Sequence, residues 1–299
     1  MTDREASGSD AGMPLAPGPP LPRAGEGEPA GIVFDFPTVT GDQTVRLPLS
    51  APEMMSAKPI FAPRSGLGGE VSRIADYYQQ RATAGLSKRY SLFQRGSLFR
   101  MQQFERDVLA ALARHGRTEL GGERILDVGC GDGGFLRRLV SWGANPSNLR
   151  GIDLLPERVA IAQRIEPCLD IRQADASALP FEDGSFDQVY QLTVFSSILD
   201  PAMRRAVAGE MTRVLRPGGL VVSYDFRVAR DRRNTRPLRA AELVALFPGF
   251  SLDVRRVTLI PPLARALAPR SWLLCELLES IPLLRTHELA VLVKPGHTR

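Results

Sequence analysis

An apolar run that ends in a glycine-rich turn constrains the fold of this chain more than any other stretch. The run covers residues 125–128 (ILDV), and the turn covers residues 129–134 (GCGDGG). Apolar groups then return at helical spacing over residues 135–140. This succession predicts a strand, a tight loop and a helix, which is the opening of a nucleotide-binding α/β unit. Glycines suit such a loop because they allow positive φ and let the backbone approach a ligand closely.

Two nucleotide-binding patterns fit this loop. Gly129, Gly131 and Gly134 match the dinucleotide fingerprint G-x-G-x-x-G. The alternative pattern, D-x-G-x-G-x-G, starts at Asp127 and continues through Gly133. It resembles motif I of the class I S-adenosylmethionine-dependent methyltransferases. Because the two patterns share the same residues, the later motifs have to decide between them.

Strands and helices are predicted to alternate after this loop. Strands are predicted at residues 124–128, 149–153, 171–175, 186–192, 220–224, 252–260 and 288–293. Helices are predicted between them at residues 135–140, 156–165, 201–215 and 238–247. Strands separated by helices predict an α/β fold with a doubly wound sheet that is covered on both faces.

The chain divides into three predicted parts. Residues 1–68 are rich in proline, glycine and alanine at first and then hold short apolar pieces, so we expect a disordered or weakly structured tail. Residues 69–117 are predicted to form an N-terminal helical cap. The main domain is predicted at residues 118–299, with an apolar insert at 261–286 that is long enough to form a lid over the site.

Composition limits the partners and the compartment. The net charge is +5, but a basic balance alone does not indicate nucleic acid, so no nucleic-acid partner is expected. The three cysteines are far apart and no pair has metal-ligand spacing, which predicts reduced thiols and no metal site. With no secretory h-region, and with no apolar stretch long enough to cross a membrane, we expect a cytoplasmic protein without a transmembrane segment. The oligomeric state is left open.

Later motifs favour the methyltransferase pattern. Asp153 ends the second predicted strand, and Asp175 ends the third in the context QADA. Residues 179–187 (LPFEDGSFD) and 210–219 (EMTRVLRPGG) are similar to two further segments of the class I methyltransferases. The resemblance covers about residues 120–225 and is greatest to the ubiquinone/menaquinone-biosynthesis-type branch of small-molecule methyltransferases. It implies a Rossmann-like seven-stranded sheet with an antiparallel last strand.

The resemblance also implies S-adenosyl-L-methionine as the cofactor. In such a site, one strand-end carboxylate accepts hydrogen bonds from the ribose hydroxyls and the next accepts from the adenine amine. The predicted cofactor-binding residues are Asp127, Gly129, Gly131, Gly133, Asp153, Leu154, Asp175, Ala176 and Gln191. An NAD(P)-dependent oxidoreductase, which would share the loop and Asp153, and a non-catalytic nucleotide-binding module are the alternatives.

Two residues are candidates for proton transfer from an acceptor. Asp225 follows the fifth predicted strand, and the alternative role for it is a helix or loop cap. If the last strand is antiparallel, His287 faces the mouth of the pocket with a pKa near its ordinary value of about 6.5. The alternative there is a surface histidine at a strand start. Thr193 and Ser196 follow the fourth strand and are expected at most to orient the acceptor.

The acceptor is expected to be a small anionic or amphipathic molecule. An apolar lid and an arginine-rich loop suit such a molecule, although an arginine run also suits a solvated surface and aromatic groups suit a plain core. The predicted substrate-binding residues are Tyr77, Tyr78, Tyr90, Arg227 and Arg230. The predicted reaction is O-methylation of a glycan, lipid-linked or secondary-metabolite hydroxyl. C-methylation of a quinone-like or polyketide-like acceptor is the alternative.

Overall fold

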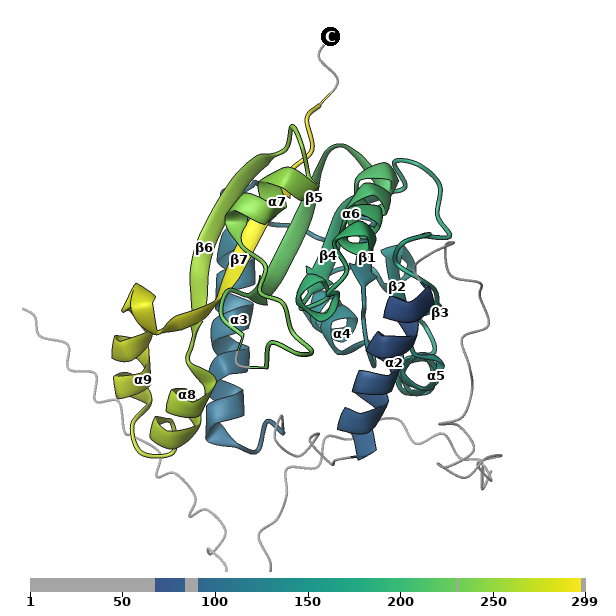
Figure 1. The fold of residues 1–299 in the computed structure, drawn as a ribbon. Helices are drawn as coiled ribbons and strands as arrows, with labels where there is room; N and C mark the ends of the chain where they lie inside the picture. The colour runs from purple at the N-terminus through teal and green to yellow at the C-terminus, as the bar shows by residue number, and fades with distance from the viewer. Residues whose placement is uncertain (1–67, 84–90, 230, 297–299) are drawn as a thin grey trace, which may run out of the picture. The chain divides into compact units, whose positions relative to one another are not determined.

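A seven-stranded sheet organises the part of the chain that the structure, a computed structural model, describes: residues 68–83, 91–229 and 231–296. The strands are β1 (Ile125–Val128), β2 (Leu149–Asp153), β3 (Asp170–Gln173), β4 (Phe186–Leu192), β5 (Leu215–Phe226), β6 (Ser251–Leu259) and β7 (Arg285–Val293). Their order is β3-β2-β1-β4-β5-β7-β6 (Figure 1). β1 to β5 pair in parallel, and β7 runs antiparallel between β5 and β6. The predicted fold class is confirmed, including the antiparallel last strand.

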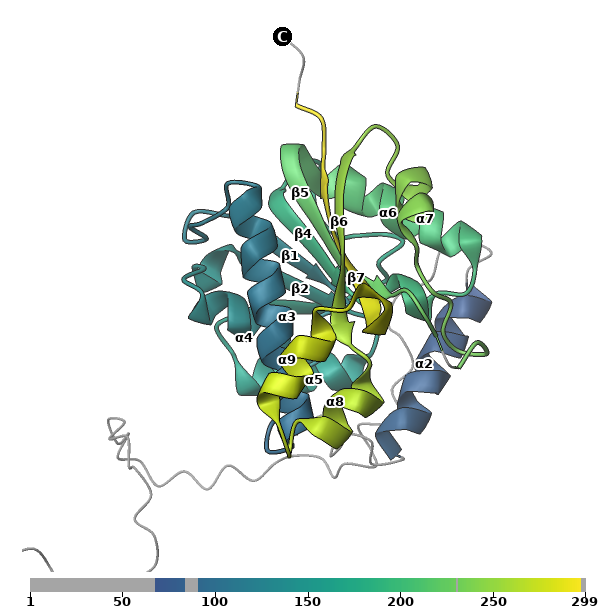
Figure 2. The same cartoon turned by 90° about the vertical axis from the view of Figure 1, so that its left-hand side faces the viewer.

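Helices cover both faces of the sheet. They are α2 (Gly68–Thr83), α3 (Arg95–Arg114), α4 (Gly134–Ser141), α5 (Pro156–Ile165), α6 (Pro201–Val214), α7 (Ala240–Leu246), α8 (Pro261–Leu267) and α9 (Trp272–Glu279). Buried side chains of α3, α4 and α5 form one core with the sheet, and those of α2, α6 and α7 form the core of the other face. Figure 2 shows α3 and α4 on one side of the sheet and α6 and α7 on the other.

The element boundaries follow local chemistry. β1 is buried along its whole length, as expected for a central parallel strand. α6 starts where Asp200 caps it, because one carboxylate oxygen accepts from the backbone N–H groups of Ala202 (2.6 Å) and Met203 (3.3 Å). Pro201 occupies the first turn, where its missing N–H costs nothing.

Two strands start three or more residues earlier than the sequence pattern predicts. β5 includes Leu215, predicted as the end of a helix, and residues 216–219, for which the pattern predicts a turn; Gly218 has a φ of 73° there. β7 starts at Arg285, which pairs with Leu259 of β6, rather than at residue 288. Since β7 pairs on both sides, its neighbours extend it beyond the apolar run that the sequence shows. This extension places His287 inside a strand.

The two helices predicted as one N-terminal cap lie on different faces of the sheet. Val71 and Ile74 of α2 pack into the α6–α7 face, whereas Val108 and Leu112 of α3 pack into the α4–α5 face. The predicted lid insert forms α8 and α9, which make a third small core with Phe99 of α3. The predicted N-terminal tail lies outside the described residues, apart from its last residue, which begins α2. Within the described residues, no helix is long and apolar enough to cross a membrane.

Candidate active site

The glycine-rich loop after β1 has a backbone conformation and a packing that side chains would disturb. Gly129, Gly131 and Gly133 all have positive φ, at 75°, 60° and 75°. A Cβ on Gly129 would also lie 2.5 Å from Cγ2 of Val194, closer than atoms can approach. The N–H of Gly129 donates to the carbonyl of Ile152 (2.8 Å), which ties the loop to β2. The loop therefore needs glycine at this position for its backbone and for its packing.

Asp153, the last residue of β2, supports this loop with its carboxylate. One oxygen accepts from the N–H of Gly131 (2.8 Å) and the other from the N–H of Leu155 (2.9 Å). Burial raises the pKa of Asp153, and the nearby guanidinium of Arg158 opposes that rise. Each oxygen has a second lone pair, so the carboxylate can still accept from a ligand hydroxyl.

Asp127 lies beneath the loop, inside β1. Its side chain is buried, and its Oδ1 has no hydrogen-bond partner within the part of the chain that the structure describes. Burial, and secondarily the nearby carboxylate of Asp153, raise its pKa well above the ordinary value. A buried carboxyl group without a partner favours its protonated form, which can donate a hydrogen bond.

A cavity of about 200 Å³ opens beside the glycine loop and will be called the cofactor cavity. Its described lining residues are Ile74, Tyr78, Gly129, Ile152, Asp153, Leu154, Leu155, Arg158, Ala174, Asp175, Ala176, Leu192, Thr193, Val194, Ser197, Ile198 and Met203. Asp175 accepts from the N–H of Ser177 (2.8 Å) through Oδ1, whereas its buried Oδ2 has no partner. Apolar walls with one unpaired acceptor suit a purine whose amino group donates, and Asp153 suits a ribose. The residues present therefore fit S-adenosylmethionine.

Five of the nine predicted cofactor-binding residues line this cavity. They are Gly129, Asp153, Leu154, Asp175 and Ala176. The remaining four (Asp127, Gly131, Gly133 and Gln191) do not line it. Gln191 instead accepts from the N–H groups of Val194 (2.9 Å) and Phe195 (3.3 Å), so it shapes the loop after β4. Arg158, which sequence reasoning missed, has no motif around it that would have marked it.

A second and larger cavity of about 680 Å³ adjoins the first and will be called the acceptor cavity. Its described lining residues are Tyr77, Tyr78, Arg81, Arg100, Thr193, Ser196, Ser197, Tyr224, Phe226, Val228, Ala229, Thr235, Ile260, Pro261, Pro262, Arg265, Thr286 and His287. They come from α2, α3, the loop after β4, the end of β5 and the loop that follows it, the residue before α8, α8 itself and β7. Tyr78, Thr193 and Ser197 line both cavities.

Tyr78 stands at the junction of the two cavities. Its hydroxyl shares a hydrogen bond with Oγ of Ser197 (2.8 Å), and the guanidinium of Arg158 lies over its ring at 4.6 Å. The rest of α2 is tied to the same loop, because Arg73 donates to the carbonyl of Ser197 and Glu70 accepts from the N–H of Leu199. One helix thus closes a wall of both cavities.

Thr193, the first residue after β4, adopts a backbone conformation that is rare for its residue type. Its φ is 65°, its N–H donates to the carbonyl of Tyr224 (2.8 Å), and its carbonyl accepts from Oγ of Ser197 (3.0 Å). A β-branched residue with positive φ is strained, and such strain is concentrated at functional sites. The strain at Thr193 lies where the two cavities meet.

His287 lies in the wall of the acceptor cavity but not at the surface. It is 1% exposed and stacks on Tyr224, with ring centroids 4.8 Å apart and 9° between the planes. Its Nδ1 shares a hydrogen bond with Oγ1 of Thr286 (3.0 Å). Burial, and secondarily the charge of Arg100, lower its pKa to about 3, not the ordinary value expected of a strand start. The imidazole is therefore neutral near pH 7 and is only a weak base.

Asp225 belongs to β5 but lines neither cavity. One oxygen of its carboxylate accepts from the N–H of Ser196 (3.1 Å), and the other accepts from the N–H of Phe226 (2.8 Å). Burial raises its pKa to about 6, and the hydrogen bond from Ser196 opposes that rise. Its neighbours Tyr224 and Phe226 point to the opposite face of the strand and line the acceptor cavity. Asp225 therefore positions the loop after β4.

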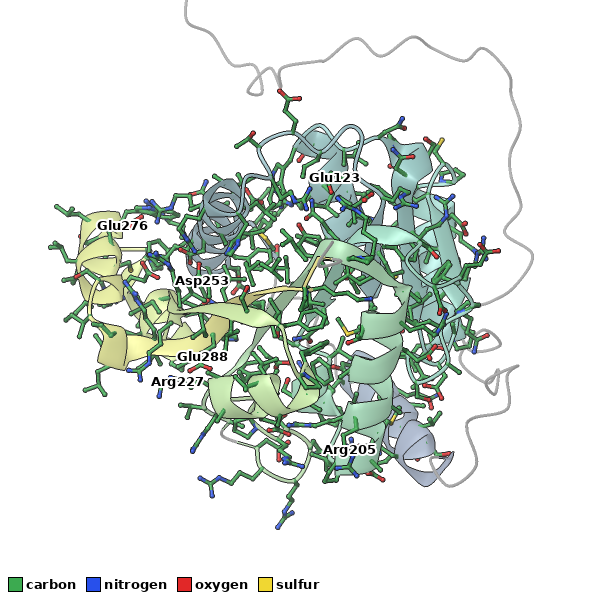
Figure 3. The ribbon with its side chains drawn as sticks, turned by 90° about the horizontal axis from the view of Figure 1, so that it is seen from above. Glu123, Arg205, Arg227, Asp253, Glu276 and Glu288 are labelled. Atoms are coloured by element: carbon green, nitrogen blue, oxygen red, sulfur yellow. The ribbon has the colours of Figure 1, made fainter. Side chains whose placement is uncertain are left out.

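The predicted substrate-binding residues are only partly brought together. Tyr77 and Tyr78 line the acceptor cavity, whereas Arg227 does not and donates to the carbonyl of Arg285 (3.1 Å). In Figure 3, Arg227 is labelled next to Glu288 of β7 and away from the other labelled residues. Tyr90 and Arg230 lie outside the described residues. The arginines that do line the acceptor cavity come from helices, and not from the arginine-rich loop that the sequence predicts.

Comparisons with known proteins agree with this geometry. A family described as "Methyltransferase domain" matches residues 125–219. Phthiotriol/phenolphthiotriol dimycocerosates methyltransferase 1 of Mycobacterium ulcerans is 41% identical over 119 residues, which cover 38% of this chain and 41% of that protein. 2-Methyl-6-phytyl-1,4-hydroquinone methyltransferase of Synechocystis is 35% identical over 133 residues, which cover 42% and 40%. The chain thus spans about two fifths of the length of these relatives.

A solved structure also resembles this chain. The S-adenosylmethionine-dependent methyltransferase of Mesorhizobium loti aligns with 62% of this chain and 96% of its own, with a TM-score of 0.46 and 24% identity. The family match covers the segment that holds the glycine loop, Asp153 and Asp175. The two nucleotide-binding patterns share the loop and Asp153, whereas the context of Asp175 favours the methyltransferase pattern. This chain carries a class I S-adenosylmethionine-dependent methyltransferase domain.

Proposed function

We propose that this protein transfers a methyl group from S-adenosylmethionine to an oxygen atom of a small amphipathic acceptor. The observation that carries the proposal is the pair of adjoining cavities that share Tyr78, Thr193 and Ser197. S-adenosylmethionine supplies an activated methyl group when it is bound. The protein's task is then to hold the acceptor in line and to exclude water from the junction.

The cofactor cavity supplies the holding groups. Asp153 is placed to accept from ribose hydroxyls, and the unpaired Oδ2 of Asp175 is placed to accept from the adenine amine. The glycine loop lets the backbone approach the amino-acid end of the cofactor. Asp127 is buried beneath the loop and does not line the cavity. These roles need no proton transfer.

The acceptor cavity favours a molecule with a polar head and an apolar body. Apolar groups of Phe226, Ile260 and Pro261 contribute to its wall, beside polar groups such as Thr286 and His287. The relatives are named for phthiotriol and phenolphthiotriol dimycocerosates and for 2-methyl-6-phytyl-1,4-hydroquinone. These names support a lipid-linked or quinone-like acceptor more than a free glycan.

His287 is the residue that we assign to orient the acceptor hydroxyl. Its Nδ1 is paired with Thr286, and its Nε2 has no hydrogen-bond partner among the described residues. Since the Thr286 hydroxyl donates to the carbonyl of Thr258 (3.4 Å), it can accept from Nδ1–H, which leaves Nε2 as an acceptor. A neutral imidazole in this tautomer can accept a hydrogen bond from a substrate hydroxyl.

C-methylation is the second candidate reaction. The observation that favours it is the absence of a strong base among the described residues that line the acceptor cavity. A hydroquinone ring carbon is already nucleophilic when its hydroxyl is ionised, and the Synechocystis relative is named for such an acceptor. Nuclear magnetic resonance of the methylated product distinguishes a methoxy group from a C-methyl group.

The first experiment is calorimetric titration of the protein with S-adenosylhomocysteine and, separately, with NADH. We expect micromolar binding of S-adenosylhomocysteine and none of NADH. Asp153→Ala should weaken the binding at least tenfold, because a buried partner of the ribose is lost. Asp132→Ala is the matched control, since Asp132 lies in the same loop but is exposed.

Transfer itself is tested with labelled S-adenosylmethionine and two sets of acceptors. One set holds prenylated hydroquinones and long-chain phenols, and the other holds free sugars. The proposal predicts label in the first set. Binding of NADH alone would overturn it in favour of an oxidoreductase, and cofactor binding without transfer to any acceptor would leave a non-catalytic binding module.

A further inference from the structure

The two cavities carry opposite charges. The described lining of the cofactor cavity includes the carboxylates of Asp153 and Asp175 with a single arginine, Arg158. The described lining of the acceptor cavity includes three arginines and no carboxylate. Those arginines are Arg81 on α2, Arg100 on α3 and Arg265 on α8. Within the described lining, the titratable groups that accompany them are Tyr77, Tyr78, Tyr224 and His287.

Arg100 differs from Arg106 and Arg114 of the same helix, which have ion pairs. Arg106 pairs with Glu276 (3.0 Å) and Arg114 pairs with Asp253 (3.2 Å), both on the outside of α3. Among the described residues Arg100 has no ion pair, and its buried Nε has no hydrogen-bond partner. A guanidinium that is partly withdrawn from water without a partner is costly to keep.

Two uncharged groups, Tyr224 and His287, lie near Arg100. Tyr224, whose hydroxyl bonds to Oγ1 of Thr258 (2.8 Å), has a pKa raised to about 12 by burial, although the charge of Arg100 lowers it in part. His287 is neutral at the same place. Neither of them can supply the negative charge that Arg100 lacks. We therefore expect a ligand to supply the negative charge that pairs with Arg100.

We propose that Arg100 binds the acceptor as an oxyanion, so that the acceptor is a phenol or an enol and not an aliphatic alcohol. This inference rests on the proposed function and specifies its substrate class. The hydroxyl proton passes to solvent and the oxygen keeps its electron pair. His287 accepts the hydrogen bond of the hydroxyl only before that proton leaves, and it does not have to remove the proton.

The size of the electrostatic effect distinguishes the two kinds of hydroxyl. A cation within about 4–6 Å lowers the pKa of an acidic group by roughly 1–3 units. A phenol with a pKa of about 10 is then substantially ionised between about pH 7 and 9. An aliphatic alcohol has a pKa near that of water, about 15.7, and stays neutral after the same shift. Since the described lining of the cavity holds no strong base, only the acidic hydroxyl becomes a nucleophile.

The test uses 4-nitrophenol, whose anion has its own visible absorbance, and protein saturated with S-adenosylhomocysteine. Titration with pH gives the pKa of the bound probe directly. We expect this pKa to lie about 1–2 units below that of the free probe. Arg100→Gln should abolish the lowering and Arg100→Lys should keep most of it. Arg106→Gln, on the same helix outside the cavity, should behave as the wild type.

Two further measurements test the role of Arg100 separately from the proposed function. Wild-type protein should bind the 4-nitrophenolate about 10- to 100-fold more tightly than the uncharged ether 4-nitroanisole, a comparison that needs no variant. Affinity for S-adenosylhomocysteine should be unchanged in Arg100→Gln, because Arg100 does not line the cofactor cavity. Absence of S-adenosylhomocysteine binding in the wild type would count against the proposed function. Normal cofactor binding with no probe bound, or with an unshifted probe pKa, would overturn the role of Arg100 alone.

Discussion

The two cavities meet at Tyr78, Thr193 and Ser197 but are assembled in different ways. Most of the wall of the cofactor cavity comes from residues 129–203, where the parallel strands end one after another. The acceptor cavity draws on α2, α3, β5, α8 and β7, which are far apart in the chain. In Figure 1, α2 and α8 lie at the same end of the sheet. The comparison teaches that cofactor recognition is encoded locally here, whereas acceptor recognition depends on tertiary packing.

The largest effect is expected at Gly129, on the affinity of the cofactor cavity. Gly129→Ala places a Cβ 2.5 Å from Val194 at a φ of 75°, so the loop or Val194, which both line the cofactor cavity, has to shift. We expect S-adenosylhomocysteine affinity to fall by about a hundredfold or more, measured by calorimetry. The acceptor cavity should keep its affinity for a phenolic probe.

Gly116→Ala is the control for backbone strain. Gly116 has a similar φ of 71°, but nothing lies within 4 Å of a Cβ built there, and it lines neither cavity. It should cost about 1 kcal/mol of stability and leave cofactor affinity unchanged. Equal loss of affinity in both variants would mean that strain, not space in the cavity, explains the result.

A second effect concerns the acceptor cavity and the pH dependence of stability. His287 has a folded-state pKa of about 3 and an unfolded value of about 6.5, so stability is full above pH 6.5 and falls toward pH 3. The difference in free energy of unfolding between wild type and His287→Phe should shift against the wild type by about 2 kcal/mol from pH 6.5 to 4.5. Urea denaturation at several pH values measures this shift.

Carboxyl groups with raised pKa values do not obscure that measurement. Asp225, with a pKa of about 6, contributes in the opposite direction because its protonated form favours the folded state. Its contribution is common to both proteins and cancels in the difference. A pH-independent difference would show that His287 titrates normally in the folded protein and is open to solvent.

A third and smaller effect is expected at Asp175, and it tests how the cofactor cavity recognises the purine. Asp175→Asn replaces the unpaired acceptor with an amide that can also donate. We expect about tenfold weaker binding of S-adenosylhomocysteine and tighter binding of S-inosylhomocysteine, which carries a carbonyl in place of the amine. Calorimetry with both ligands gives the preference. An unchanged preference would place the purine away from Asp175.

The smallest effect is expected at the junction. Tyr78→Phe removes the hydrogen bond to Ser197 but keeps the ring under Arg158. Loss of one hydrogen bond should weaken both cofactor and acceptor binding by about three- to tenfold. Tyr77→Phe, on the same helix, should affect the acceptor only, because Tyr77 lines only that cavity. A similar pattern for the two variants would mean that Tyr78 does not connect the cavities.

The cofactor cavity could be predicted from the sequence because a single α/β unit dictates it. A glycine loop after β1 and acidic residues just after the next strands must meet at one edge of a parallel sheet. Gly129, Asp153 and Asp175 follow from that rule and line the cavity. The same rule predicts Gln191, but its side chain bonds to the loop after β4. The rule gives the position of a residue in the sheet and not the direction of its side chain.

The acceptor cavity could be predicted only in part. Tyr77 and Tyr78 are recognisable in the sequence as aromatic groups on a helix. Arg100 and Arg265 are not recognisable as lining residues, because the apolar pattern of a helix does not indicate which other helix packs against it. The pKa of His287 was missed for a related reason: pairing with β5 and β6 extends β7 and buries the imidazole. Contacts of this kind arise from packing between distant segments, which a local pattern does not record.

The attachment of α2 has a consequence for turnover. This helix forms a wall of both cavities and is fastened to the loop between them through Glu70, Arg73 and Tyr78. Releasing those three contacts would uncover both cavities at once. We therefore expect departure of the spent cofactor and of the methylated product to be governed by one opening event, so that the two leave at similar rates. The enzyme would then work in discrete rounds, with both compartments emptied and refilled together.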